Sequence, residues 1–485
     1  MKSHFSKSVS SKKASPVQST QPTYQSQASS KDANSALKSS LKSWKIRFPD
    51  DFHVHLRSAE LLPYTTPFTA QSFRRAIIMP NLSPPISTVA AALTYRNQIL
   101  SALTEASLSH TPYRYNNNDD DDNKAYYSDK VGHRNRISTK KLPYPFNKFT
   151  PLMTLYLQET TAKKDLVALA RSSEIIGCKY YPKGVTTHAN YGIKSLATIS
   201  PVLEIMEELK IPLMIHGESP EKDIDVFDRE AHFIEHVLTP IIDRFPTLKI
   251  TLEHITSRHA VAFIRDAPAH VCATITLHHL LLTRNDLLAS TLKPHFYCKP
   301  IMKREADRKA LLNAALGRYD APYNAPYDAP TSNATSPSQQ NTSKNTPPPP
   351  ISPQKSMPPA PAYKKGKFFF GSDSAPHQKS LKEAACGCAG VFSAPFCIEM
   401  LAQIFAEQNA KEHLEAFVSV NGAAHYNLPL NTDTLELIPT TNNDIENTIP
   451  NAYHFGAHKT FIPFRPFPQL KWKQNSQIFE NSQGP

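Results

Sequence analysis

Short apolar runs alternate with longer amphipathic stretches along most of the chain. Eight runs rich in β-branched and aromatic residues predict β-strands at 45–54, 75–80, 149–157, 177–181, 211–215, 249–253, 271–277 and 367–370. Helical periodicity lies between most of them, at 86–103, 163–171, 195–209, 228–244, 259–266 and 304–316. Repeated strand–helix units with nearly continuous apolar strands are typical of a parallel sheet. Eight such units predict an α/β fold, the closed (β/α)8 TIM barrel.

Three segments interrupt this pattern, at 1–43, about 114–141 and about 317–367. The first is rich in Ser, Gln and Lys, the second contains an unbroken Asn/Asp run at 116–123, and the third holds 12 of the 42 prolines. Segments of this composition bury too little apolar surface to offset chain entropy. We therefore expect a disordered N-terminal tail and two disordered insertions in one barrel domain that spans 44–485.

The net charge of +12 resides in these three segments. They carry excesses of six, two and four positive charges, so the remaining residues are neutral overall. A uniformly basic, nucleic-acid-binding body is therefore excluded, and the body shows no aromatic–basic recognition module. Because each segment precedes a predicted strand, we expect the excess charge at the barrel face opposite the active-site mouth.

The sequence also bears on location. Six cysteines in 485 residues and the lack of a secretory signal indicate a reducing compartment. No apolar run approaches the roughly 20 residues that a membrane span needs. We expect a cytoplasmic protein that binds neither membrane nor nucleic acid. Organelle targeting is the less favoured alternative, because no arginine precedes Arg47.

Polar side chains stand at the ends of several predicted strands. In a barrel these ends meet at one mouth, where the active sites of this fold lie. In chain order the side chains are His53, His55, Arg57, Asn81, Lys179, His216, His254 and Asp373. We therefore expect a single polar site there, whereas Asp50 is expected to supply only a turn or surface carboxylate.

The histidines indicate a metal site. His53 and His55 are two residues apart, so on a strand both point to the same face and can bind one ion. Neutral imidazoles suit zinc and its neighbours in the first transition row. With His216, His254 and Asp373 added, the ligands exceed what a single open catalytic zinc needs, so we expect two ions.

Lys179 is the unusual member of this group, because two dications would repel its ammonium. Burial and neighbouring cations lower the pKa of a lysine, so that the free amine can react with carbon dioxide. The resulting carbamate is anionic and offers one oxygen to each metal. We therefore expect Lys179 to be N6-carboxylysine and to bridge the ions. The alternative is an inward lysine paired with an acid near the barrel wall.

Blocks of sequence surround these side chains. They are Asp51-Phe-His53-Val-His55-Leu-Arg57, Met79-Pro-Asn81-Leu82, Lys179-Tyr-Tyr-Pro182 with Thr186-Thr187, His216-Gly-Glu218, Glu253-His254-Ile-Thr256, Gly371-Ser-Asp373-Ser-Ala-Pro-His377, Cys386-Gly-Cys-Ala-Gly390, and Ser419-Val-Asn-Gly422 with Leu428-Pro429. In this order, over residues 44 to about 435, the chain resembles the stand-alone bacterial-type dihydroorotases of the amidohydrolase superfamily.

The resemblance implies interconversion of (S)-dihydroorotate and N-carbamoyl-L-aspartate, the third step of de novo pyrimidine (UMP) synthesis. It implies a homodimer with two Zn²⁺ per subunit, bridged by carboxylated Lys179 and hydroxide. One zinc would be held by His53, His55, Lys179 and Asp373, and the other by Lys179, His216 and His254. The implied substrate-binding residues are His55, Arg57, Asn81, His216, Lys299, His377 and Ala389. The family more often carries an apolar residue at Lys299, so the implied contact there is made by the main chain.

The chemistry assigns roles to three parts of this set. Metal-activated water attacks the amide, and Asp373 acts as general acid and base by moving the water's proton to the leaving nitrogen. The planar guanidinium of Arg57 suits the substrate carboxylate. Thr186 and Thr187 lie in a loop at 183–192 that is expected to close over the mouth.

Two other functions fit parts of the sequence. A hydantoinase or allantoinase would share the metals but not the carboxylate clamp, and Arg57 and His377 argue against it. A non-catalytic homologue that scaffolds another pyrimidine enzyme should have lost some metal ligands, but all six positions are intact here.

Overall fold

The computed structural model describes residues 43–109, 114–115, 146–185, 189–193, 195–318, 366–440, 448–455 and 459–475. Nearly all of the expected disordered tail, most of both insertions, and Thr186 and Thr187 lie outside the described residues.

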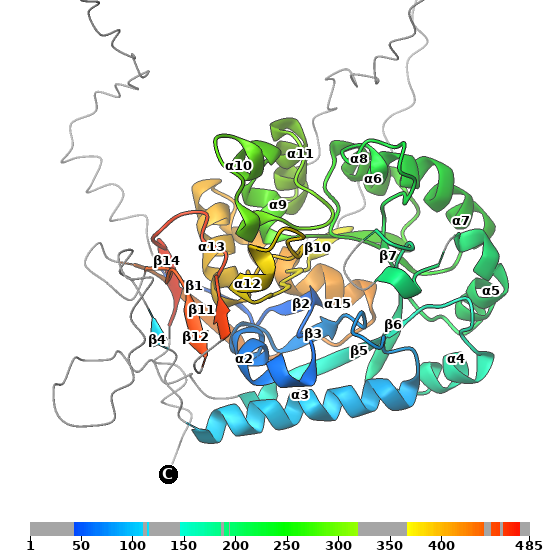
Figure 1. The fold of residues 1–485 in the computed structure, drawn as a ribbon, viewed down its shortest axis with the longest axis horizontal. Coiled ribbons are helices and arrows are strands. Elements are labelled where there is room, and N and C mark those ends of the chain that lie inside the picture. The colour runs from blue at the N-terminus through cyan, green and yellow to red at the C-terminus, as the bar shows by residue number, and fades with distance from the viewer. Residues whose placement is uncertain are drawn as a thin grey trace, which may run out of the picture. The chain divides into compact units, whose positions relative to one another are not determined.

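Eight parallel strands form the predicted barrel (Figure 1). In the order in which they pair, they are β10 (Phe368–Phe370), β9 (Val271–Ile275), β8 (Ile250–Glu253), β7 (Leu213–His216), β6 (Ile175–Tyr180), β5 (Thr150–Tyr156), β3 (Arg75–Ile78) and β2 (Asp50–Val54). Beyond β10, Ser374 bridges Val54 in parallel, and the Asp373 N–H donates to the His53 carbonyl at 2.8 Å. These contacts join the two outer strands of the sheet, and all eight predicted strands are present.

Helices surround the strands (Figure 1). They are α2 (Leu62–Ser72), α3 (Val89–Ser109), α4 (Lys163–Ala170), α5 (Ser200–Glu208), α6 (Arg229–Phe233), α7 (Thr239–Arg244), α8 (Arg258–Asp266), α9 (Leu277–Leu281), α10 (Arg284–Leu288), α11 (Glu305–Ala315), α12 (Lys379–Lys382), α13 (Cys397–Glu407), α14 (Lys411–Glu415) and α15 (Asn421–His425). The shorter 3₁₀ segments are η1 (Ala59–Leu61), η2 (Phe146–Lys148), η3 (Ala189–Tyr191), η4 (Leu196–Ile199), η6 (Pro294–Phe296) and η7 (Ala394–Phe396), and two π turns are η5 (Ile234–Leu238) and η8 (Ala416–Val420).

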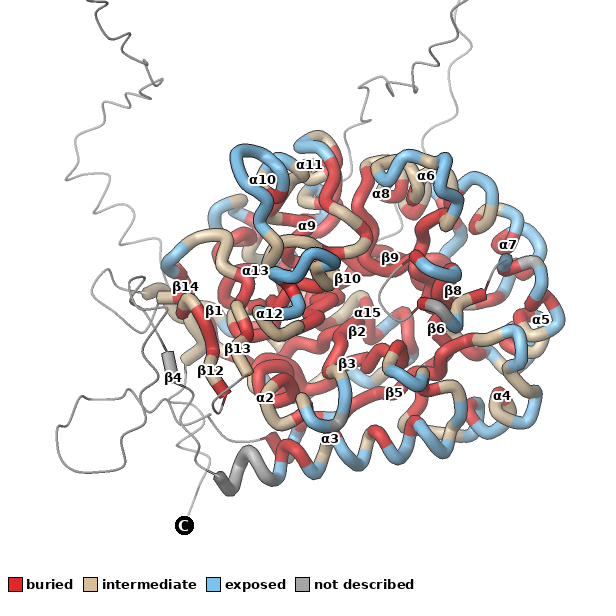
Figure 2. The backbone as a smooth tube through the Cα atoms, viewed as in Figure 1, coloured by how far each residue is buried: buried red, intermediate tan, exposed pale blue. Residues whose placement is uncertain are grey.

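The six predicted helical stretches all contain helices. In α8, for example, the Ser257 side chain accepts the Ala260 N–H at the N-terminus, and Ala260 and Ile264 form the buried face. Figure 2 shows the strands almost wholly buried and the helices exposed on one face. None of the described helices has the length and apolar character that a membrane span requires.

The first predicted strand, 45–54, was wrong in one respect, because it is two strands. β1 (Trp44–Arg47) lies outside the barrel sheet. It pairs antiparallel with β11 (Thr434–Pro439), which in turn pairs with β14 (Trp472–Gln474). Pro49 separates β1 from β2 and has no N–H to donate to a ladder.

A third sheet contains β13 (Lys459–Phe461), β12 (Tyr453–Phe455) and β4 (Arg114–Tyr115). β4 falls in the insertion that composition predicts to be disordered, so that prediction fails at these two residues. Tyr453 and Phe461 pack in a buried cluster with Phe68 and Phe392, which attaches the C-terminal stretch to the barrel.

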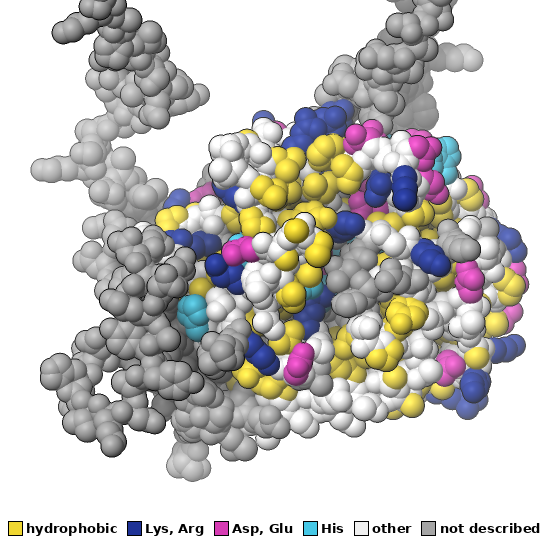
Figure 3. Space-filling view, viewed as in Figure 1, with side chains coloured by type: hydrophobic (Ala, Val, Ile, Leu, Met, Phe, Trp, Pro, Cys, Tyr) yellow, Lys and Arg dark blue, Asp and Glu magenta, His cyan; other side chains and the backbone are white. Residues whose placement is uncertain are grey.

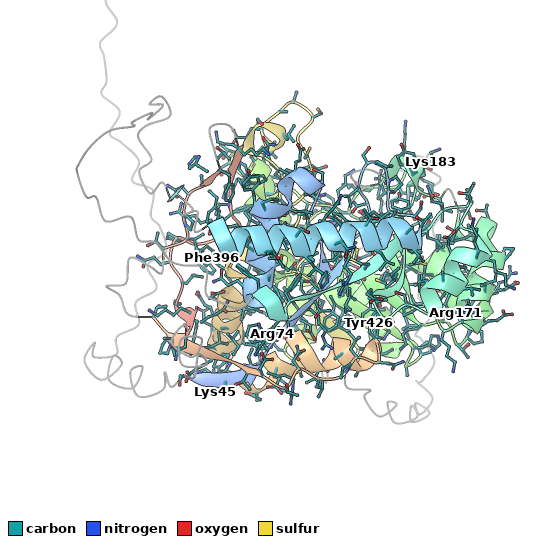
Figure 4. The ribbon with its side chains drawn as sticks, turned by 90° about the horizontal axis from the view of Figure 1, so that it is seen from below. Lys45, Arg74, Arg171, Lys183, Phe396 and Tyr426 are labelled. Atoms are coloured by element: carbon teal, nitrogen blue, oxygen red, sulfur yellow. The ribbon has the colours of Figure 1, made fainter. Side chains whose placement is uncertain are left out.

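An apolar cluster fills the barrel below its polar mouth. It takes side chains from six strands, including Phe52, Met214 and Phe369, and it is completed by Tyr426 at the end of α15. Figure 4 labels Tyr426 beside that helix. The Phe52 ring lies 5.2 Å from Phe369 and 5.9 Å from Tyr426, centroid to centroid. One end of the barrel is therefore closed, which leaves the other end for the site.

Candidate metal centre and substrate pocket

A cavity of about 360 Å³, part of it open to solvent, lies at the C-terminal ends of the strands. Nine of the side chains expected in the site line it: His53, His55, Arg57, Asn81, His216, His254, Lys299, Asp373 and Ala389. Tyr181, Ala375 and Gly390 also line it and were not expected there. The structure therefore brings residues from eight separate stretches of chain to one place.

Three atoms converge in the first part of the centre. The His53 Nε2 lies 3.4 Å from the His55 Nε2 and 3.4 Å from the Asp373 Oδ1, and the His55 Nε2 lies 3.1 Å from the same oxygen. Ligands about 2.1 Å from a common ion are spaced in this way. Although burial alone would raise it, the pKa of Asp373 is held well below its usual range by both imidazoles, so the carboxylate stays ionised.

The second part of the centre contains His216 and His254. Their ring centroids are 4.7 Å apart, and His254 lies 5.0 Å from His53. The buried Nδ1 of His254 has no hydrogen-bond partner among the described residues. Because an unpaired buried polar atom costs free energy, this arrangement fits a bound ion.

Lys179 lies on β6, fully buried among these histidines. Its Nζ has no hydrogen-bond partner, and none of the described carboxylates forms an ion pair with it. Burial lowers the pKa of Lys179 to about 8, although Glu253 and Asp373 act in the opposite direction. A free amine is therefore accessible near neutral pH. The donor set fits a pair of metal ions, and the alternative, in which Lys179 pairs with an acid, is not seen among the described residues.

Two carboxylates orient the histidines and carried no role in the sequence prediction. Glu253 accepts from the His53 Nδ1 at 2.9 Å and from the Thr274 hydroxyl at 2.6 Å. Glu218 lies 2.8 Å from the His216 Nε2. Because each carboxylate fixes the proton on one ring nitrogen, the Nε2 of His53 and the Nδ1 of His216 are left as lone-pair donors. Each acid is close in sequence to a predicted ligand, Glu253 just before His254 and Glu218 two residues after His216, and this was the available signal.

Backbone conformation also marks the site. Arg57, His254 and Asp373 all have positive φ angles, of 70°, 42° and 43°. Non-glycine residues adopt this conformation at a cost and concentrate in functional sites. No residue pattern in the sequence indicated it.

Arg57 is held by the loop that follows β10. Its Nε donates to the Pro376 carbonyl at 3.0 Å, and its Nη2 donates to the His377 Nε2 at 2.7 Å. A guanidinium can only donate, so the proton of His377 resides on Nδ1, and the 3.1 Å approach of its Nε2 to the Ala389 oxygen is a contact only. His377 therefore positions Arg57 and does not itself line the cavity.

The sequence also led to predictions for Asp50 and Lys299, which are not among the proposed metal ligands. Asp50 is buried, not at the surface, and its Oδ1 accepts from the Arg75 Nε at 3.0 Å. The Lys299 side chain lines the cavity, and its Nζ donates to the Val185 carbonyl at 2.8 Å. Val185 lies in the loop that was expected to close the mouth, but Thr186 and Thr187 are outside the described residues.

Known proteins similar to this chain include dihydroorotases. The dihydroorotase of Idiomarina loihiensis is 38% identical over 435 residues, which cover 89% of this chain and 99% of that protein. The dihydroorotase of Hahella chejuensis is 37% identical over 428 residues, 88% of this chain and 97% of that protein. No protein-family model matches the chain.

Solved structures agree. The crystal structure of Campylobacter jejuni dihydroorotase is 30% identical with a TM-score of 0.64, covering 90% of this chain and 98% of that one. Dihydroorotase of Saccharomyces cerevisiae in complex with 5-fluoroorotic acid is 27% identical with a TM-score of 0.66, covering 90% and 99%. An L-hydantoinase of Arthrobacter aurescens is 12% identical with a TM-score of 0.57, so it shares the fold alone.

Proposed function

The chain belongs to the dihydroorotase family and is a hydrolase of a cyclic amide C–N bond, and we propose that it works with two Zn²⁺ bridged by carboxylated Lys179. The substrates in this proposal are (S)-dihydroorotate and N-carbamoyl-L-aspartate. The observation that carries the metal proposal is the buried Lys179 amine, which has no hydrogen-bond partner among the described residues and lies near His53, His216 and His254.

We assign one ion to His53, His55, Asp373 and the Lys179 carbamate. The other ion is assigned to the same carbamate with His216 and His254. The convergence of His53, His55 and Asp373 supports the first group, and the neighbouring rings of His216 and His254 support the second. When bound, two such ions acidify water and polarise the amide carbonyl.

The residues of the chain then orient the substrate and move its proton. Asp373 accepts the proton of the attacking water and delivers it to the ring nitrogen as the C–N bond breaks, because an amide anion is too basic to leave unprotonated. In the cyclising direction the same carboxylate removes a proton from the ureido nitrogen. The guanidinium of Arg57, aimed by Pro376 and His377, binds the substrate carboxylate together with Asn81.

Other parts of the proposal concern the protein as a whole. We propose a homodimer, in keeping with the family resemblance. We also propose a cytoplasmic location, because the low cysteine content indicates a reducing compartment. A hydantoinase activity is the second candidate, but its relative shares only the fold, and the Arg57 arrangement favours a substrate that carries a carboxylate.

The test combines metal content with turnover. The purified protein is expected to hold two zinc ions per chain and to hydrolyse dihydroorotate. Asp373→Asn, which keeps the size of the side chain, is expected to lose at least about a thousandfold in kcat, because a proton-transfer group and a ligand are removed together. Active protein without metal would refute the mechanism, and turnover of hydantoin but not dihydroorotate would refute the substrate.

The carbamate has its own test. Protein reconstituted with zinc in ¹³C-bicarbonate is expected to show one carbamate carbon resonance that Lys179→Met lacks. Lys183→Met is a matched control, because Lys183 is an exposed lysine only four residues further along the chain. An unlabelled but fully active parent would remove the carbamate from the proposal.

A further inference from the structure

The buried ammonium of Lys382 has no part in the chemistry described above. Lys382 is the last residue of α12 and is 4% exposed. Its Nζ donates to three main-chain carbonyls, those of Tyr297 at 2.9 Å, Cys388 at 2.9 Å and Gly390 at 2.6 Å. Removing a lysine ammonium from water costs free energy. A buried lysine that donates to three main-chain oxygens is therefore expected to have a specific role.

The three carbonyls belong to two segments that form one wall of the cavity. The first segment is 297–300, whose Lys299 lines the cavity, and the second is 386–390, whose Ala389 and Gly390 line it. The Gly390 N–H also donates to the Tyr297 carbonyl at 2.9 Å. Lys382 therefore joins two pieces of main chain that are far apart in sequence.

Both segments are tightly constrained at the positions next to Lys382. Gly390 has a φ of 147°, and a Cβ there would meet the Ala375 carbonyl oxygen at 2.4 Å. At the other end of the first segment, the Pro300 carbonyl lies 3.1 Å from the His279 Nε2 and 3.2 Å from the Cys298 thiol. Lys299 thus lies between two anchored carbonyls, which limits the movement of its main chain.

The three contacts depend on the charged ammonium group of Lys382 as well as on the length of its side chain. An ammonium has three N–H donors and serves the three carbonyls at once. A neutral side chain of the same length would leave the Cys388 and Gly390 oxygens without this donor and free to turn. None of the described carboxylates forms a hydrogen bond or an ion pair with Lys382, so the three carbonyls are its hydrogen-bond partners.

We infer that Lys382 is a positioning residue for substrate binding. It holds segments 297–300 and 386–390 in the geometry that presents the main chain of Lys299 and Ala389 to the dihydroorotate ring. This inference rests on the proposed function and on the family resemblance, which implies that these two positions contact the substrate. Lys382 touches neither the metal ligands nor the reacting atoms.

The test is Lys382→Met in the full-length, zinc-loaded enzyme. The KM for dihydroorotate is expected to rise roughly ten- to hundredfold while kcat at saturation stays within about threefold, because misplaced binding groups weaken binding without removing the chemistry. The dissociation constant of 5-fluoroorotic acid, measured by calorimetry, is expected to rise by a similar factor. Zinc content should stay at the parental value.

Controls separate positioning from a general loss of structure. Lys379→Met lies on the same helix, where Lys379 is 44% exposed and pairs with Glu383, and it should leave KM unchanged. Lys382→Arg, which keeps the charge and several donors, should restore most of the binding. If Lys382→Met fails to fold, Lys382→Gln replaces it, because its one amide group cannot donate to all three carbonyls, and KM is again expected to rise. A folded Lys382→Met enzyme with parental KM and parental 5-fluoroorotic acid binding would overturn the inference. A parent enzyme that does not turn over dihydroorotate would instead overturn the proposed function.

Discussion

At the scale of single residues, the site depends on how each polar group is held. Arg57 has a positive φ and two fixed donors, so its remaining N–H groups face the cavity in one orientation. A lysine ammonium at the same position would keep the charge, but it cannot make the planar bidentate contact to a carboxylate.

We therefore expect Arg57→Lys to raise the KM for dihydroorotate by roughly ten- to a hundredfold, since a bidentate charged contact is worth about 1.5–3 kcal/mol. Steady-state kinetics measure this effect. Arg244→Lys is the control, because Arg244 is half exposed, pairs with Glu204 at the surface and does not line the cavity. Unchanged binding of carbamoyl aspartate in Arg57→Lys would show that this guanidinium does not hold the substrate.

Single residues also show which parts of the site the sequence could not predict. The residues that we propose as metal ligands could be singled out from the sequence because histidines, a lysine and an aspartate stand at strand ends, where the barrel topology brings them together. Glu253 and Glu218 were visible but had no assigned role, since only the distances to His53 and His216 reveal it. Asp50 was wrongly expected at the surface. The sequence does not show that Arg75, on the neighbouring strand, lies beside Asp50 and binds its carboxylate.

At the scale of elements, the apolar runs predicted the eight strands, since buried parallel strands need side chains that are apolar on both faces. The split between β1 and β2 escaped prediction, because the pairing of β1 with β11 joins residues almost 400 positions apart. Helix α15 was not predicted either. It is only five residues long, and its place under the barrel depends on contacts with the strands above it.

Gly422 shows how closely α15 packs against β2. A Cβ at this position would meet the Phe52 ring at 2.3 Å, and that ring is buried in the apolar cluster below the site. We expect Gly422→Ala to lower the free energy of unfolding by about 1–3 kcal/mol, because a packed ring must move to admit the methyl group.

Urea denaturation measures this change. Ala424→Ser is the control, because Ala424 lies on the same helix and is exposed, and exposed substitutions usually change stability by less than about 0.5 kcal/mol. Equal stability of Gly422→Ala and the parent would mean that α15 does not pack on β2 as the structure has it.

At the scale of the whole molecule, the net charge of +12 is separate from the chemistry. Acidic and basic side chains are interspersed over the described surface seen in Figure 3, in keeping with a body that is neutral overall. The site instead uses a few buried charges whose partners are fixed. Electrostatic interactions in the site therefore depend on the positions of these few groups and not on a surface potential of one sign.

The places where the Pro-rich insertion leaves and rejoins the barrel support this separation. Gly317, after α11, lies beside His413 of α14, and Gly366, before β10, lies beside Asn421 of α15. The side chain of Asn421 donates to the Phe368 carbonyl at 3.0 Å. Both ends of the insertion are thus next to α14 and α15, and α15 lies at the closed end of the barrel, opposite the cavity.

We therefore expect that replacing residues 319–364 with a short Gly/Ser linker leaves kcat and KM within a few-fold of the parent. The physical reason is that loop length costs little free energy, about 0.6 kcal/mol for each doubling, and that neither end of the insertion touches the cavity. Steady-state kinetics and zinc content measure the outcome. Deleting 386–390 in a parallel variant is the positive control, because that segment lines the cavity and its loss should abolish activity. A large loss of turnover in the 319–364 deletion, with zinc content retained, would show that the insertion reaches the mouth and takes part in binding.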